Sequence, residues 1–118
     1  MGFTEELEAL GVNVKEGTER VMGDQSLYEM MLGMFLDTLE SSPVSLEDFD
    51  APDQEELIRR IHVLKGTTGN LSLTPLFEGY METLALLREG QAGRAKAVMK
   101  NLLPVQEKVV DCIRRNRG

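Results

Sequence analysis

The sequence predicts an all-α fold, an antiparallel four-helix bundle preceded by one or two short N-terminal helices. Apolar residues recur at spacings of three and four along successive segments, as in amphipathic helices. No segment alternates polar and apolar residues with period two, and none carries a hairpin turn signal. The links are short and contain Gly or Pro, which favours antiparallel neighbours. At 118 residues, the chain (1–118) is predicted to form a single domain with one modest core.

The first two predicted helices are short and precede the bundle. Thr4 is a suitable N-cap for the first, and Gly11 is a suitable end. Asn13 and Glu16 have the spacing of a capping box, which predicts a second helix that runs to Met22. These segments are predicted to cover one end of the bundle.

The first long helix is predicted to begin near Asp24 and to be interrupted at Pro43. Its methionines are interpreted as adaptable core filler, because a soft-metal site would need cysteine or histidine beside them. A further helical turn after Pro43 is predicted to face the core through Val44, Leu46 and Phe49. The predicted core positions of the long helix are Leu27, Met30, Met31, Met34, Phe35 and Thr38.

The next helix is predicted over 53–70, with Asp53 and Glu56 at the cap spacing. Its apolar stripe consists of Leu57, Ile61, Leu64, Thr68 and Leu71. Thr74 and Pro75 then suit the cap and first turn of another helix that stops at Gly90. The core positions of that helix are predicted to be Leu73, Leu76, Phe77, Tyr80, Leu84 and Leu87.

The last helix is predicted to begin near Gln91 and to be the longest. Pro104 lies inside it and is expected to remove one backbone hydrogen bond and to kink the helix. The seam that packs in the bundle is predicted to be Ala95, Val98, Leu102, Val105, Val109 and Cys112.

His62 is the only histidine of the chain, and it lies on the face opposite the apolar stripe of its helix. With His62 at 0° on a helical wheel, Lys65 falls near −60°, Gly66 near +40° and Gly69 near −20°. A glycine within a helix costs about 1 kcal/mol relative to alanine, so two on one face need a reason. The simplest is that a large partner approaches the imidazole.

Composition excludes several classes of function. A net charge of −7 and a pI near 4.7 argue against nucleic acid and against anionic membranes as partners. No apolar run could span a bilayer and no secretory signal is visible, so a cytoplasmic location is expected. The single cysteine, Cys112, excludes an internal disulfide and is expected to be a buried apolar residue.

Most chemistries that could use His62 lack their other components. Nothing in the sequence indicates a nucleophile paired with this histidine, or the upstream glycine of a phosphate-binding loop. A metal site would need further ligands, and Glu55 is the only obvious candidate on this face. A solvated imidazole is largely neutral at cytoplasmic pH, so its free lone pair can accept a phosphoryl group. Lys65 would then offset the charge of that group.

A phosphoryl acceptor of this kind needs a partner, because nothing in the chain predicts binding of ATP or Mg²⁺. The residues predicted to contact the partner are Ile58, Arg59, Gly66 and Gly69. Of these, Ile58 falls about 40° from His62 on the wheel and is expected on the exposed side. The alternative is a scattered surface isoleucine, which is common.

The segment His62-Val63-Leu64-Lys65-Gly66, followed by small residues and Asn70-Leu71, resembles the H-x-L-K-G signature of histidine-containing phosphotransfer (HPt) domains. The resemblance extends over most of the chain. It implies a phosphorelay intermediate without kinase activity, which accepts a phosphoryl group from the aspartate of one response-regulator receiver domain and passes it to another. Separately, a bundle that closes within one chain favours a monomer. His62 would be the phosphorylated residue, Lys65 the neighbouring cation and Gly66 the clearance position. Ser72 departs from the pattern, because many family members have glycine there.

The resemblance also implies partners and cofactors. The expected partners are receiver domains, with a hybrid sensor histidine kinase as a further candidate. No cofactor is expected on this chain, and Mg²⁺ is expected only on the receiver. Two alternatives stay open: a non-catalytic module that binds a receiver or kinase without phosphorylation, and a metal-dependent sensor that uses His62.

Overall fold

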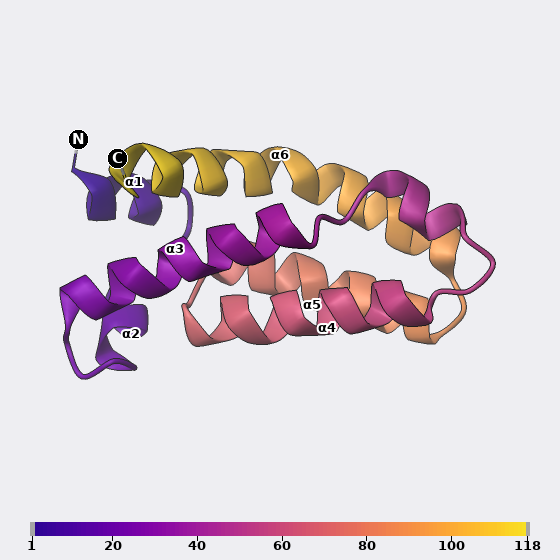
Figure 1. The fold of residues 1–118 in the computed structure, drawn as a ribbon, viewed down its shortest axis with the longest axis horizontal. Helices are drawn as coiled ribbons and strands as arrows, with labels where there is room; N and C mark the ends of the chain where they lie inside the picture. Colours follow the sequence, from indigo (N-terminus) through magenta and orange to yellow (C-terminus); the bar gives the residue numbers. More distant parts are fainter. Residues whose placement is uncertain (1, 118) are drawn as a thin grey trace.

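The computed structural model describes residues 2–117, and that part of the chain is helical without strands. This confirms the predicted all-α class. In Figure 1, each of the four long helices runs opposite to the one before it along the chain. The elements in order are α1 (Phe3–Ala9), α2 (Val14–Glu19), α3 (Gln25–Ser41), the 3₁₀ helix η1 (Leu46–Asp50), α4 (Glu55–Asn70), α5 (Thr74–Arg88) and α6 (Ala92–Arg117).

α5 is at the centre of the packing, because it contacts both α4 and α6 along its length. α6 is also contacted by α1, α3 and η1. Figure 1 shows α3 beside the C-terminal half of α6 and η1 beside its N-terminal half. One side of the bundle is therefore built from two helices in series, separated by the link that contains Pro43. Phe49 on η1 is buried, as the sequence predicted for this turn.

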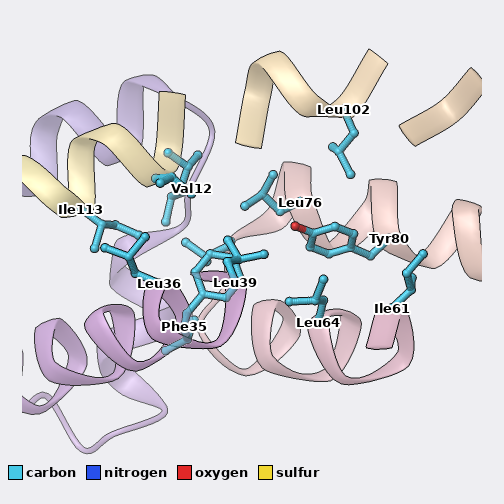
Figure 2. Packing of buried hydrophobic residues seen from close by; sticks show 14 of the residues in the cluster. Val12, Phe35, Leu36, Leu39, Ile61, Leu64, Leu76, Tyr80, Leu102 and Ile113 are labelled. Carbon is cyan, nitrogen blue, oxygen red and sulfur yellow. The ribbon is translucent and has the colours of Figure 1, made fainter. Parts of the chain in front are cut away.

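The core is formed by leucines, aromatic residues and valines from all the long helices (Figure 2). Prediction of the α3 core face was partly wrong: Met30 and Met34 are 58% and 59% exposed. The buried face of α3 is turned by roughly 100° from the predicted one. It consists of Tyr28, Leu32, Phe35, Leu36 and Leu39, with Gly33 beside them. Apolar residues surround most of this helix, so their spacing alone does not select a face.

The beginnings of three helices differ from the predicted caps. α1 is capped by Gly2 and not by Thr4, which lies inside the helix. α4 begins at Glu55, and its N-cap Gln54 makes no side-chain cap bond. Asp53 instead accepts a hydrogen bond from the Glu55 N–H at 2.9 Å. Thr74 is likewise inside α5, one residue after the cap.

The N-cap predicted for α2 was confirmed. The Asn13 side chain accepts from the Glu16 N–H at 3.1 Å and caps α2, as predicted. α2 nevertheless ends at Glu19, and the chain turns through Met22 at a φ of 59°.

α6 continues past Pro104 to Arg117. Val98 and Val105, predicted for the α6 seam, are only partly buried, whereas Met99, Val110 and Ile113 are buried.

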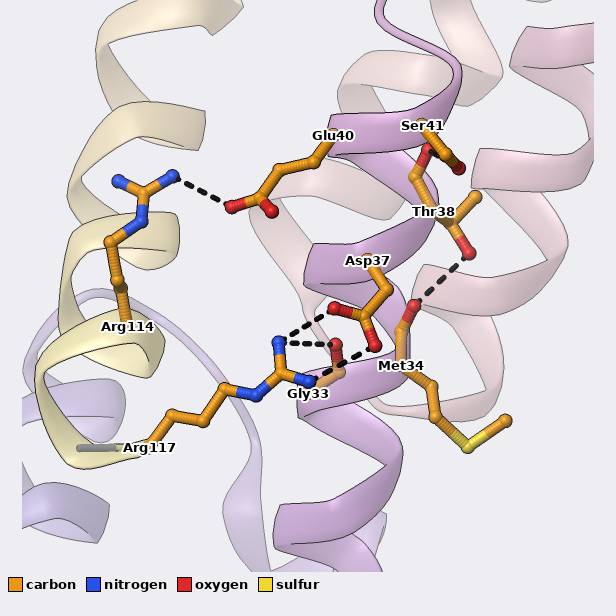
Figure 3. A network of polar contacts seen from close by, with 8 residues as sticks. All are labelled: Gly33, Met34, Asp37, Thr38, Glu40, Ser41, Arg114 and Arg117. Atoms are coloured by element: carbon orange, nitrogen blue, oxygen red, sulfur yellow. Dashed lines mark hydrogen bonds and ion pairs between the residues drawn. The ribbon is translucent and has the colours of Figure 1, made fainter.

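Arginines at the end of α6 bind acidic residues of α3 (Figure 3). The Arg117 guanidinium contacts both carboxylate oxygens of Asp37 at 2.7 and 3.0 Å and also the Gly33 carbonyl. Arg114 binds Glu40 at 3.1 Å. The hydrogen bond from Arg117 lowers the pKa of the Asp37 carboxyl group. These exposed ion pairs link the C-terminal end of α6 to α3.

Cys112 is buried, as predicted, on the core side of α6. Burial raises the pKa of its thiol to about 11, and the nearby Glu6 carboxylate acts in the same direction. The thiol is therefore protonated at neutral pH, which removes it as a candidate nucleophile. None of the helices within residues 2–117 combines the length and the apolarity needed to cross a bilayer.

Candidate functional site

His62 lies at the middle of α4 with its side chain exposed to solvent, as its position on the helical wheel predicted. The opposite side of α4 is buried, including Ile61 and Leu64. In Figure 2, both of these side chains extend from α4 toward Tyr80 on α5. Packing of this face fixes the rotation of α4 about its axis and so holds the imidazole outward.

Lys65 and Gly66 lie one turn after His62. Lys65 is partly buried and Gly66 is exposed. A Cβ atom placed on Gly66 would have no neighbour within 4 Å outside its own helix turn. The surface beside the imidazole is therefore open at Gly66.

Gly69 has a different role from the one predicted. A Cβ atom there would lie 3.1 Å from both Cδ1 and Cε1 of Phe77 on α5. This is closer than an ordinary van der Waals contact, so a side chain at position 69 would crowd the Phe77 ring. Gly69 allows α4 and α5 to approach closely, and this packing accounts for the glycine without any partner.

The remaining two predicted contact residues are Ile58 and Arg59. Ile58 was expected on the exposed side, but it is partly buried and packs against the core. Arg59 is exposed and is bound through two nitrogens to Glu56, with Nε to Oε2 at 3.0 Å and Nη2 to Oε1 at 2.6 Å. The hydrogen bond from Arg59 lowers the pKa of the Glu56 carboxyl group. The exposed apolar side chain next to His62 is instead Val63, at 43% exposure.

Arg60 fixes the beginning of α4 and was not identified from the sequence. Its Nη1 donates to the Pro43 carbonyl at 2.6 Å and lies 3.5 Å from an Asp48 oxygen. The side chain is only 18% exposed. It thus joins α4 to the link between α3 and η1. The contact depends on residues far apart in the sequence, and no local pattern indicates it.

Ser72 ends the histidine helix in a conformation that usually requires glycine. Its φ is 55°, in the left-handed region. The Leu73 N–H binds the Thr68 carbonyl and the Ser72 N–H binds the Gly69 carbonyl, which together form a Schellman motif. The turn at the end of α4 therefore follows the geometry expected for glycine, although serine occupies the position.

The buried Ser72 side chain also joins the end of α4 to α2. Its hydroxyl donates to Glu16 Oε1 at 2.7 Å and accepts from Arg20 Nε at 3.3 Å. The Ser72 carbonyl accepts from the Asn13 N–H at 3.0 Å. These bonds hold the N-terminal segment against the end of the histidine helix, where it covers that end of the bundle.

Two substitutions of Ser72 separate the cost of its backbone conformation from the value of its hydroxyl group. Both alanine and glycine remove the hydroxyl, but only alanine keeps a Cβ atom at positive φ. Ser72→Gly is therefore expected to be about 1 kcal/mol more stable than Ser72→Ala. Urea unfolding followed by circular dichroism measures the difference. Equal stabilities would contradict a left-handed conformation at this position.

The part of the chain that the structure describes supplies no set of metal ligands around His62. Within residues 2–117, no group of three or more His, Cys, Asp or Glu side chains is placed to hold a metal ion. Glu55 is exposed in the first turn of α4 and has no further acidic or thiol partner with His62.

Comparisons with protein-family models, with curated proteins and with solved structures found no match to this chain. The residues and geometry of α4 are therefore the basis for assigning a function to this protein.

Proposed function

We propose that this protein is a histidine phosphotransfer protein of a two-component phosphorelay. The observation that carries the proposal is the solvent-exposed imidazole of His62, beside the open surface at Gly66 and one turn before Lys65. The similarity of His62-Val63-Leu64-Lys65-Gly66 to the H-x-L-K-G signature supports the same function. The donor and the acceptor would be aspartates of response-regulator receiver domains, including the receiver domain of a hybrid sensor histidine kinase.

The proposed transfer needs only a ring nitrogen and access to it. The nitrogen lone pair attacks the phosphorus of the aspartyl phosphate on the receiver. An N–P bond forms while the P–O bond to the aspartate breaks, and the bonding electrons leave with the carboxylate. The reverse reaction delivers the phosphoryl group to a second receiver. In-line attack requires the receiver's active site to approach closely, which the open surface at Gly66 permits.

Lys65 is proposed to stabilise the phosphorylated state. The phosphoryl group brings roughly two negative charges to the surface of α4. Side chains on a helix lean toward its N-terminus, so Lys65 leans toward the turn that carries His62. Its ammonium group can thus reach the phosphoryl oxygens. The Mg²⁺ that assists such transfer would be held by the receiver, and no ATP-dependent kinase activity is proposed for this chain.

The decisive experiment traces the phosphoryl group from a phosphorylated receiver to this protein. Wild type is expected to acquire acid-labile, base-stable phosphate, and His62→Gln is expected to acquire none. The assignment is direct because the chain has one histidine. His62 is exposed, so unfolding of the variant should match wild type. Label that persists in His62→Gln would contradict the proposal. Retained partner binding and retained cellular function in this variant would favour the non-catalytic module.

Substitution of Gly66 tests the access to His62. Gly66→Ala is expected to stabilise the fold by up to about 1 kcal/mol, because the new methyl group meets no neighbour. The same methyl group is expected to slow transfer from a receiver by roughly ten- to a hundredfold. Labelling by the small donor phosphoramidate should be unaffected.

Gly93→Ala is the matched control for this variant, because Gly93 also lies in a helix with no neighbour within 4 Å. It should not change either rate. Unchanged transfer from receivers to Gly66→Ala would show that a partner does not approach this position.

A further inference from the structure

The exposed face of α4 carries a second cation near His62, Arg59, which is already bound to a carboxylate. Arg59 and His62 are three residues apart, a separation at which side chains on a helix are neighbours. Glu56 is three residues before Arg59, so Arg59 lies between Glu56 and His62 along the helix. In the structure the guanidinium is turned toward Glu56.

Side-chain direction places a phosphoryl group on His62 within reach of Arg59. A helical side chain covers the surface over the turn N-terminal to its own Cα. The imidazole of His62 therefore leans toward the turn that carries Arg59, while Lys65 leans toward His62 from the other side. A phosphoryl group on the ring would stand between the two cations. Lys65 supplies one positive charge, and the roughly two negative charges of the group leave a second to be balanced.

The bond between Arg59 and Glu56 can be exchanged at small cost. Both side chains are 62% exposed, and ion pairs in such surroundings contribute little to stability. The two-point contact of the guanidinium with the carboxylate has the geometry that also suits phosphoryl oxygens. Glu56 would keep a cation after the exchange, because Arg60 Nε lies 3.8 Å from its Oε1.

We propose that, when His62 is phosphorylated, the Arg59 guanidinium leaves the Glu56 carboxylate and binds the phosphoryl group. Arg59 then stabilises the phosphorylated state, and Glu56 competes with the phosphoryl group for the guanidinium. This inference rests on the proposed function. Glu56 makes the phosphorylated state less favourable than Arg59 and Lys65 alone would make it. The group is thereby held loosely enough to be passed on.

The test uses phosphoramidate to phosphorylate His62 without any receiver and follows the phosphoryl group by ³¹P NMR during a pH titration. A nearby cation makes the last ionisation of the phosphoryl group easier. Arg59→Gln is expected to raise the midpoint of this titration by about half a pH unit, a threefold change in proton affinity. Glu56→Gln is expected to lower it. In the double variant, the effect of Glu56→Gln should disappear.

Two further variants complete the experiment. Arg59→Lys restores the charge without the two-point geometry and should recover only part of the change. Arg114→Gln removes an exposed arginine that is paired with Glu40 on α3, and it should leave the titration unchanged. The Nε–H resonance of Arg59 should move on phosphorylation of wild type and stay in place in the presence of inorganic phosphate alone.

The outcomes separate this inference from the proposed function. Equal midpoints in wild type and Arg59→Gln would overturn the proposed exchange of Arg59 and would leave the phosphorelay function unaffected. Labelling by phosphoramidate but by no phosphorylated receiver overturns the phosphorelay function, while the titration still decides whether Arg59 moves. A wild-type protein that takes no phosphoryl group from either donor overturns both.

Discussion

Leu64→Ala is expected to destabilise the protein by about 2–5 kcal/mol, whereas Val63→Ala should cost less than about 0.5 kcal/mol. The two residues are adjacent on α4, but Leu64 is 2% exposed and Val63 is 43% exposed. Truncation of Leu64 leaves a cavity between α4 and α5, opposite Tyr80 (Figure 2). Urea unfolding followed by circular dichroism measures both changes.

This pair of variants also tests the orientation on which the site depends. His62 faces solvent only if Leu64 and its neighbours on the stripe face the core. Similar losses for Leu64→Ala and Val63→Ala would mean that α4 is rotated about its axis. The imidazole would then lose its open approach, and the proposed transfer would lose its geometric basis.

The stripe on α4 was predictable from the sequence because this helix is strongly amphipathic. Leu57, Ile61, Leu64, Thr68 and Leu71 were predicted to face the core, and all are buried. The exposed side of the same helix is polar, so only one rotation buries the apolar residues. α3 has no such contrast, and its spacing was compatible with two faces. Which of them is buried depends on packing against α6, which the local pattern does not contain.

The residues of the candidate site differ in the same way, because some are placed by helical geometry alone and others by contacts with another helix. The common face of His62, Lys65 and Gly66 follows from helical geometry within one segment, so the sequence was sufficient. The role of Gly69 depends on Phe77 of α5, and the partial burial of Ile58 depends on the assembled core. Residues whose environment is supplied by another helix were the ones that local reasoning misplaced.

Ser72 is an intermediate case. Ser72 departs from the HPt pattern, in which many members have glycine, and its φ of 55° lies in the left-handed region that glycine adopts without strain. The bonds of its hydroxyl group to Glu16 and Arg20 join residues more than fifty positions apart, and only the fold brings them together. A serine there serves both the turn and the attachment of α2.

Gly17→Ala is expected to destabilise the protein by about 1–3 kcal/mol, although alanine favours helix formation. Gly17 is buried in α2 against the end of the histidine helix. A Cβ atom there would lie 2.5 Å from Cε1 of Tyr28 and 2.8 Å from the Leu71 carbonyl oxygen. The ring cannot simply move, because Tyr28 is fully buried and its hydroxyl donates to that same carbonyl at 2.8 Å.

The methyl group of alanine must therefore displace α2, or the tyrosine, or the end of α4. Thermal and urea unfolding measure the loss, with Gly93→Ala as the control in which alanine meets no neighbour and should stabilise slightly. Displacement of α2 would also weaken the bond between Ser72 and Glu16, so amide exchange should increase at Asn13 and at Ser72. Stability equal to that of Gly93→Ala would contradict the close approach of α2 to the histidine helix.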